Sequence, residues 1–254
     1  MKKFIENTVY SNPVRYDDEN WWKKDDLEMW KYLCGNDSNK NVLELASGTG
    51  RITFPLLKEG HNLTGIDLSK SFYDYACKLA KQYKYINCTF LNENMTNFNL
   101  HKKFDIIIIG FNSFLHLLND DEARACLNCV EKHLHEKGRF YIDIYRPTPL
   151  HYCRPNNLRT EAIEYFDTQI NEKVIIEETN NYNVDEELNQ ITWYYSSKKK
   201  KDFQITKSFT RMYWPETMNR LILDTGLKIL NIWGDYNFNH FNEKSNLQIY
   251  EIGK

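Results

Sequence analysis

The sequence predicts an α/β fold in which helices cover both faces of a mostly parallel sheet. Short apolar runs alternate with helical patterns over residues 41–145, which is typical of parallel strands joined by crossover helices. A turn of small residues, Ala46 to Gly50, follows the first of these runs. Residues 150–214 show instead strand-like runs between polar turns, which predicts an antiparallel cap inserted after the fifth strand.

The first part of the chain divides into five strands and three helices. The strands are expected at 41–45, 62–67, 86–91, 104–110 and 139–145. The helices are expected at about 50–59, 70–83 and 120–136, the last beginning near Asp120 and ending at Gly138. Upstream, residues 17–33 predict one or two further helices, which carry Trp21, Trp22 and Trp30.

The second part supplies the cap and then returns to the sheet. Cap strands are expected at 163–170, 174–182, 190–197 and 203–213. A helix then begins with Pro215 at its first position and stops at Gly226. Strands at 227–236 and 247–252 bring the main sheet to seven.

Composition excludes several classes of partner. The 254 residues suffice for one large α/β domain with an insertion, and 33 Lys+Arg against 35 Asp+Glu leave a net charge of -2. That balance gives no electrostatic case for a nucleic acid or an acidic membrane. No apolar run reaches 18 residues and the start, Met1 to Asn7, is polar, so we expect a cytoplasmic protein with no membrane segment.

Two local patterns have structural explanations that we prefer. Cys126 and Cys129 form a C-x-x-C, with His133 one helical turn further on, but no second ligand pair follows. Helix packing is therefore expected, with reduced thiols and no metal. The four lysines Lys198–Lys201 are interpreted as a solvated hairpin turn.

Aromatic residues are abundant, with 17 Tyr, 14 Phe and 6 Trp. Many fall in residues 10–32 and 145–214, outside the expected core. They indicate either a walled pocket for an organic substrate or the packing of a small antiparallel sheet.

The strongest chemical signal is the segment Val42 to Arg51, VLELASGTGR. Small residues at the carboxyl end of a parallel strand let the backbone pass close beneath a ligand. The spacing A-x-G-x-G differs from the G-x-G-x-x-G of dinucleotide binders. Polar segments also end the next three strands: Asp67 in GIDLS, Asn94 in NENM, and Phe111 to Leu117. A carboxylate at the second strand can accept bonds from both hydroxyls of a ribose.

These four segments together resemble the class I S-adenosylmethionine methyltransferases over about residues 40–145, which implies a Rossmann-like fold. LELASGTGR is similar to the family's first motif, GIDLS to its second, and NENM to the pair beside the adenine amine. Ala46 stands where the first glycine is usual, and Asn94 where an aspartate is usual. The resemblance implies S-adenosylmethionine as cofactor and S-adenosylhomocysteine as product. The cofactor-binding residues it implies are Glu44, Ala46, Gly48, Gly50, Arg51, Asp67, Leu68, Asn94, Met95 and Phe111.

Within that family the inserted cap resembles the small-molecule N-methyltransferases, both the glycine type and the amino-sugar type. Tyr16-Asp17 is similar to a pair in those enzymes that closes over the cofactor. The domains expected are an N-terminal helical segment over 1–39, a cofactor-binding core over 40–149, a substrate cap over 150–214, and a return to the core over 215–254.

Several residues are candidates for binding the methyl acceptor or for catalysis. His116 is the candidate proton acceptor and Tyr16 a second catalytic candidate, although a packing role suits His116 equally well. Trp21, Trp22, Asp143, Tyr145 and Tyr182 are the candidate substrate-binding residues, and each has an alternative role in the core. Arg51 meets the cofactor carboxylate or simply begins its helix.

The reaction expected is methylation of an amine nitrogen on a small molecule or a peptide N-terminus, by a monomer or a homodimer. The alternatives are an O-methyltransferase and a nucleoside-binding protein without turnover on the same fold. The Asn-Pro-Pro-Tyr motif of nucleic-acid amino methyltransferases is absent, since Asn12-Pro13 continues as Val14-Arg15.

Overall fold

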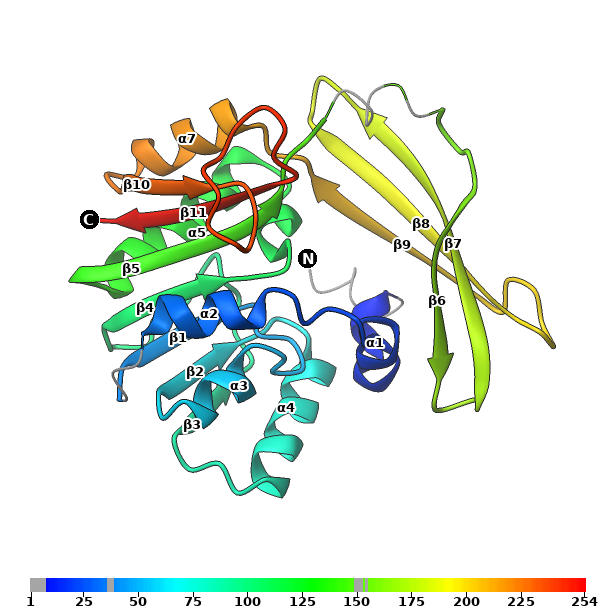
Figure 1. Cartoon of the computed structure of the whole chain (residues 1–254), viewed down its shortest axis with the longest axis horizontal. Coiled ribbons are helices and arrows are strands. Elements are labelled where there is room, and N and C mark those ends of the chain that lie inside the picture. The colour runs from blue at the N-terminus through cyan, green and yellow to red at the C-terminus, as the bar shows by residue number, and fades with distance from the viewer. Residues whose placement is uncertain (1–7, 36–38, 149–152, 154) are drawn as a thin grey trace. The chain divides into compact units, whose positions relative to one another are not determined.

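The computed structural model describes residues 8–35, 39–148, 153 and 155–254. The chain divides into two compact units, each made from separate segments (Figure 1). Residues 25–147 and 213–254 form the core unit, and residues 1–24 and 148–212 form the cap unit. The polar start Met1–Asn7 lies outside the described residues.

The core unit contains the predicted seven-stranded sheet, in the order β10-β11-β5-β4-β1-β2-β3. Five strands are parallel: β1 (Asn41–Leu45), β2 (Asn62–Ile66), β3 (Cys88–Leu91), β4 (Phe104–Ile109) and β5 (Leu134–Tyr145). Strand β11 (Leu247–Gly253) runs antiparallel to both of its neighbours, β5 and β10 (Lys228–Trp233). The fold class predicted from the sequence is confirmed.

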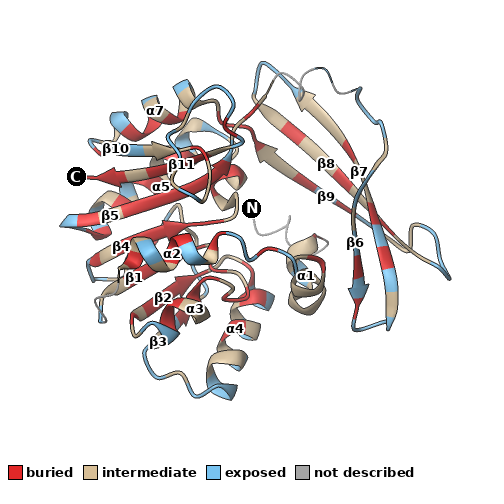
Figure 2. Cartoon of the chain, in the orientation of Figure 1, coloured by how far each residue is buried: buried red, intermediate tan, exposed pale blue. Residues whose placement is uncertain are grey.

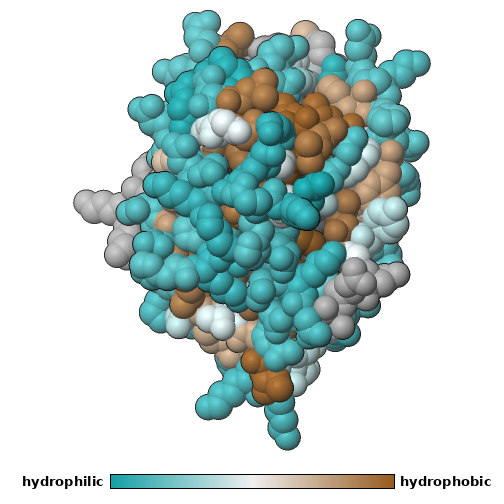
Figure 3. All heavy atoms as spheres, turned by 90° about the vertical axis from the view of Figure 1, so that its left-hand side faces the viewer, coloured by the Kyte–Doolittle hydropathy of each residue, from teal (hydrophilic) through white to brown (hydrophobic). Residues whose placement is uncertain are grey.

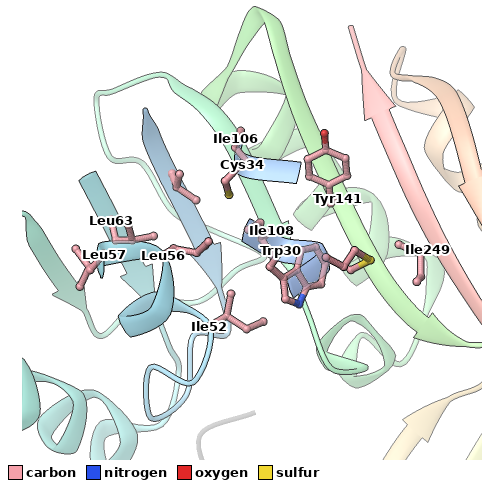
Figure 4. Close-up of a cluster of buried hydrophobic side chains, with 12 residues drawn as sticks. Trp30, Cys34, Ile52, Leu56, Leu57, Leu63, Ile106, Ile108, Tyr141 and Ile249 are labelled. Carbon is pink, nitrogen blue, oxygen red and sulfur yellow. The ribbon is translucent and has the colours of Figure 1, made fainter. Parts of the chain in front are cut away.

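Helices cover the sheet because its strands are apolar on both faces. They are α2 (Leu27–Cys34), α3 (Thr53–Lys58), α4 (Lys70–Gln82), α5 (Asp120–His133) and α7 (Pro215–Asp224). On one face, Ile106 and Ile108 pack with Trp30 of α2 and Leu56 of α3 (Figure 4). Figure 2 shows that the central strands of this unit are mostly buried.

Helix α5 differs at its end from the prediction. It begins at Asp120 as expected, with Asn119 as N-cap: the Asn119 Oδ1 accepts the Glu122 N–H at 2.9 Å. It ends at His133 rather than near Gly138, because Leu134 already pairs with Phe104 of β4. Gly138 therefore lies inside β5 and does not end the helix. The predicted stop of α7 is confirmed, since Gly226 follows it with a φ of 79°.

The cap unit is a four-stranded antiparallel sheet with a short helix. Its strands are β6 (Thr160–Asp167), β7 (Glu172–Asn183), β8 (Leu188–Ser197) and β9 (Gln204–Arg211), paired in that order. The 3-10 turn η2 (Val9–Ser11) and helix α1 (Pro13–Glu19) belong to the same unit. Tyr165, Val174, Ile176 and Tyr195 form its small core.

The N-terminal helices belong to different units. Helix α1 contacts β6: Arg15 Nε donates to Asp167 Oδ2 at 2.7 Å, and the Thr168 N–H donates to Asp18 Oδ2 at 2.8 Å. Helix α2 packs instead in the core unit. The segment expected to act as one element over residues 1–39 is thus divided near residue 24.

The C-x-x-C segment serves packing. Cys126 is buried, and Cys129 lies 3.6 Å from the Thr96 carbonyl. The His133 ring accepts the Leu100 N–H at Nε2 and bonds the Cys129 carbonyl through Nδ1. Over the described ranges, no group of three or more His, Cys, Asp or Glu side chains is placed to hold a metal.

The face turned to the viewer in Figure 3 is mostly hydrophilic, with a hydrophobic area in its upper part. Among the helices that the structure describes, none is long and apolar enough to cross a membrane.

Candidate functional site

The glycine-rich loop follows β1 at the carboxyl edge of the core sheet. Ala46, Gly48 and Gly50 all have positive φ, of 54°, 58° and 91°. A left-handed backbone favours glycine, so alanine at position 46 is the strained member of the three. A Cβ at Gly48 would meet only the Phe72 ring, at 3.7 Å. A single added methyl group would therefore make only an ordinary van der Waals contact at this position.

Asp67 links this loop to the next strand. Its carboxylate oxygens accept the N–H groups of Gly48 and Ser69, each at 2.8 Å. Burial raises the pKa of Asp67 to about 6, and the two backbone N–H groups act in the opposite direction. The side chain is only half-buried, and each oxygen keeps a lone pair for a further donor. Asp67 is thus placed to accept two hydroxyl groups.

The end of β3 is tied to the end of β2. Asn92 Nδ2 donates to the carbonyls of Asp67 and Leu68, at 2.8 and 3.0 Å. Two residues later, the Asn94 side-chain oxygen accepts the Thr96 N–H at 2.9 Å. Leu68, Asn94 and Met95 are half-buried. Their predicted contact with an adenine ring stays a prediction.

Glu44 has a buried carboxyl group, with 4% of the residue exposed. The Thr53 hydroxyl, at the start of α3, donates to it. Burial raises the pKa of Glu44 to about 8, against the effect of that hydrogen bond. The side chain joins β1 to α3, and its predicted role at the cofactor stays a prediction.

Arg51 has a partner that the sequence analysis did not weigh. Its guanidinium group binds the fully buried Asp26 through two bonds of 2.6 and 2.8 Å. Trp30 Nε1 donates to the same carboxylate at 3.0 Å. The guanidinium carbon also lies 5.1 Å from the centre of the Phe111 ring. Arg51 therefore joins α2, the loop after β1 and the segment after β4.

The segment after β4 contains Phe111 and, in the 3-10 turn η3 (Ser113–His116), the candidate base His116. Both side chains are half-buried. Asp143 on β5 is only 1% exposed and accepts the Phe111 N–H at 3.2 Å. Its carboxylate thus binds the backbone of this segment, which agrees with the alternative structural role weighed for Asp143, and its predicted contact with a substrate stays a prediction. Tyr145 ends β5 and is 47% exposed.

The remaining candidates lie in the cap unit. Tyr16 is in α1, with its ring centre 6.0 Å from that of Tyr10. Trp21 and Trp22 are 60% and 45% exposed, and Tyr182 lies on β7. Their predicted contact with a substrate stays a prediction.

Asp26 and Tyr236 are site residues that the sequence analysis missed. Asp26 precedes α2 without a capping hydrogen bond from its side chain. Tyr236, between β10 and β11, donates to Asp143 Oδ2 at 3.0 Å. No motif marks either residue, because each acts through a partner far away in the sequence.

Comparison with known proteins assigns the fold. Residues 42–138 match the family model described as "Methyltransferase domain". A protein of Geobacillus sp. (strain WCH70) named as a methyltransferase is 30% identical over 111 residues, which are 44% of this chain and 44% of that protein. The chain thus spans less than half the length of that curated relative.

Solved structures match almost the whole chain. The CcbJ methyltransferase from Streptomyces caelestis has a TM-score of 0.83 and 18% identity, covering 97% of this chain and 98% of its own. The sugar N-methyltransferase KedS8 from Streptoalloteichus sp. ATCC 53650 has a TM-score of 0.71 and 13% identity, covering 98% and 94%. The chain therefore has the class I S-adenosylmethionine-dependent methyltransferase fold, and its residues 42–138 are similar to the methyltransferase-domain family.

Proposed function

We propose that the chain transfers a methyl group from S-adenosylmethionine to an amine nitrogen of a small molecule or a peptide N-terminus. The observation that carries the proposal is the bond between the Gly48 N–H and Asp67 at the carboxyl edge of β1 and β2. Ligands of open α/β sheets bind at this edge. The bond places a half-buried carboxylate directly beside the glycine-rich loop.

The residues at this edge fit S-adenosylmethionine. Asp67 would accept the two ribose hydroxyls, and the small loop residues would lie under the methionine part. Leu68, Asn94 and Met95 would surround the adenine. When bound, this cofactor supplies a methyl group that is already activated on a sulfonium ion.

The preference for an amine nitrogen has three supports. The solved neighbour KedS8 is named as a sugar N-methyltransferase. The Tyr16-Asp17 pair and the cap after β5 resemble enzymes of the same kind. Aromatic side chains such as Trp21 and Trp22 suit a methylated, positively charged product, since cations bind aromatic faces.

The residues of the chain have two tasks in this reaction. They hold the amine in line with the bond that breaks, and they exclude water. The amine must also lose a proton, because only its neutral form has a lone pair for attack. We propose that the imidazole of His116, at the end of the 3-10 turn η3, accepts that proton.

A screen of amines and short peptides with the purified chain tests the proposal. Release of S-adenosylhomocysteine reports transfer, and mass spectrometry locates the added methyl group. Methyl found only on oxygen or carbon would contradict the amine assignment and leave the cofactor assignment standing. A chain that binds neither S-adenosylmethionine nor S-adenosylhomocysteine would contradict both.

A single variant tests the base. His116→Ala should lower the maximal rate about 10²-fold if the imidazole accepts the proton. His135→Ala, at an exposed position of β5, is the matched control. A loss of less than about threefold in His116→Ala would mean that the proton leaves to water and that positioning carries the rate.

A further inference from the structure

The segment that follows β4 begins in an uncommon backbone conformation. Phe111 and Asn112 are consecutive left-handed residues, with φ of 50° and 63°. A bulky side chain is strained in this region of the backbone map. Such a conformation persists only where neighbouring groups hold it.

Strand β5 supplies three of the bonds that hold it. Asp143 accepts the Phe111 N–H at Oδ2, at 3.2 Å, and the Asn112 N–H at its backbone carbonyl, at 3.0 Å. In return, the Tyr145 N–H donates to Asn112 Oδ1 at 2.7 Å. The two left-handed residues are therefore fastened to the end of the neighbouring strand.

Tyr236 fixes the carboxylate itself. Its hydroxyl donates at 3.0 Å to the same Asp143 Oδ2 that accepts the Phe111 N–H. Burial and the neighbouring Asp143 charge raise the pKa of Tyr236 far above its usual range, so the hydroxyl stays a donor. The connection between β10 and β11 thereby sets the orientation of a buried carboxylate.

The Phe111 ring is held from its other side by Arg51. The guanidinium carbon lies 5.1 Å from the ring centre, and the guanidinium group is fixed by its two bonds to Asp26. The ring is thus directed toward the end of the glycine-rich loop, where Arg51 follows Gly50.

We propose that Asp143 and Tyr236 are positioning residues for cofactor binding, because they hold Phe111 in the left-handed conformation that places its ring beside the glycine-rich loop. This inference rests on the proposed function and on the contact between Phe111 and S-adenosylmethionine that the family resemblance implies. Neither residue touches the cofactor in this account. Both act through the backbone of Phe111.

Calorimetry of S-adenosylhomocysteine with two tyrosine variants tests the inference without needing the methyl acceptor. Tyr236→Phe removes the hydrogen bond to Asp143. Tyr250→Phe is the matched control, because Tyr250 is fully buried and its hydroxyl donates to Gln248 at the same 3.0 Å. Tyr250 pairs with Ile142, next to Asp143 on β5, and so faces the other side of the sheet.

Both variants should lose thermal stability, since each loses one hydrogen bond, which is part-buried for Tyr236 and buried for Tyr250. Only Tyr236→Phe should weaken the binding of S-adenosylhomocysteine, by about fivefold, because displacing the Phe111 contact costs affinity. The amide proton resonance of Phe111 should move in that variant and stay unchanged in Tyr250→Phe. Asp143→Asn should weaken binding further, by about tenfold. If Asp143→Asn does not fold, Tyr236→Phe alone provides the test.

Unchanged affinity in Tyr236→Phe would overturn the inference, as would an equal loss in Tyr250→Phe. If the natural chain itself does not bind S-adenosylhomocysteine, the proposed function is wrong. That outcome differs from the one that overturns the inference, in which the natural chain binds and the variants do not behave as expected.

Discussion

The ionisation of Asp67 should make cofactor binding weaker in mildly acidic solution than at neutral pH. Its carboxylate accepts the N–H groups of Gly48 and Ser69 at 2.8 Å and has lone pairs left for a ribose. Only the ionised form can accept all of these bonds. Because burial raises the pKa of Asp67 to about 6, the group takes up a proton in mildly acidic solution.

The sign and the size of the effect follow from that value. Affinity for S-adenosylhomocysteine should be full well above pH 6 and fall as the pH drops through 6. At pH 5 only about one tenth of the free chain holds the ionised carboxylate, so the dissociation constant should rise about tenfold relative to pH 7. Replacing the side chain by Asp67→Ala removes the acceptors altogether. A hydrogen bond to a charged group contributes about 1.5–3 kcal/mol, so binding should weaken by one to two orders of magnitude or more.

Isothermal titration calorimetry from pH 5 to pH 8 measures both effects. Asp74→Ala, which removes an exposed carboxylate from α4, is the matched control and should keep the affinity and pH dependence of the natural chain. Asp67→Ala should bind weakly with little pH dependence. A natural chain whose affinity is constant from pH 5 to pH 7, or an Asp67→Ala variant with full affinity, would refute this account of the site.

Three further predictions concern the loop, the buried ion pair and the cap. Gly48→Val should abolish S-adenosylhomocysteine binding in calorimetry, because a branched side chain would crowd the loop beside the Phe72 ring and strain a φ of 58°; retained binding would place the ligand elsewhere. Arg51→Lys should lower the free energy of unfolding in urea by roughly 2 kcal/mol, since a lysine cannot make the two-bond contact with buried Asp26; a change below about 0.5 kcal/mol would contradict this. Burial raises the pKa of Glu19 in the cap to about 8, so its contribution to stability is full below pH 4.5 and is lost as the pH rises through 8. Glu19→Gln should flatten that decline in denaturation measured at pH 5 and pH 8.5, and an unchanged slope would show that Glu19 is not its source.

Patterns that depend on neighbours in the sequence predicted much of the fold. Alternating apolar runs gave the strands of the core, and the A-x-G-x-G spacing located the loop that Asp67 binds. The end of α5 was wrong because glycine usually stops a helix, whereas Leu134 enters the sheet through its pairing with Phe104. Strand pairing is a long-range property, and residues 134–138 carry no local sign of it.

The partners of the site residues were less predictable than the residues themselves. Arg51 and Phe111 stand in recognisable positions after β1 and β4, but their contacts with Asp26 and Asp143 join distant parts of the chain. Likewise, nothing near Arg15 indicates a partner at Asp167. Charge patterns predict only neighbours within about one helical turn, so contacts of this kind need the folded structure.

The contacts of α1 have a consequence for the order in which the chain can fold. Arg15 and Asp167 are separated by 152 residues, so the helix is synthesised long before the strands against which it packs. The core unit, by contrast, contains strand pairs that are close in sequence, such as β1 with β2, and these require a much shorter loop to close. During synthesis, a helix of 7 residues has too few internal hydrogen bonds to persist alone. Helix α1 should therefore become stable only after the cap strands have been synthesised, and the closure of this long loop should be among the last events of folding.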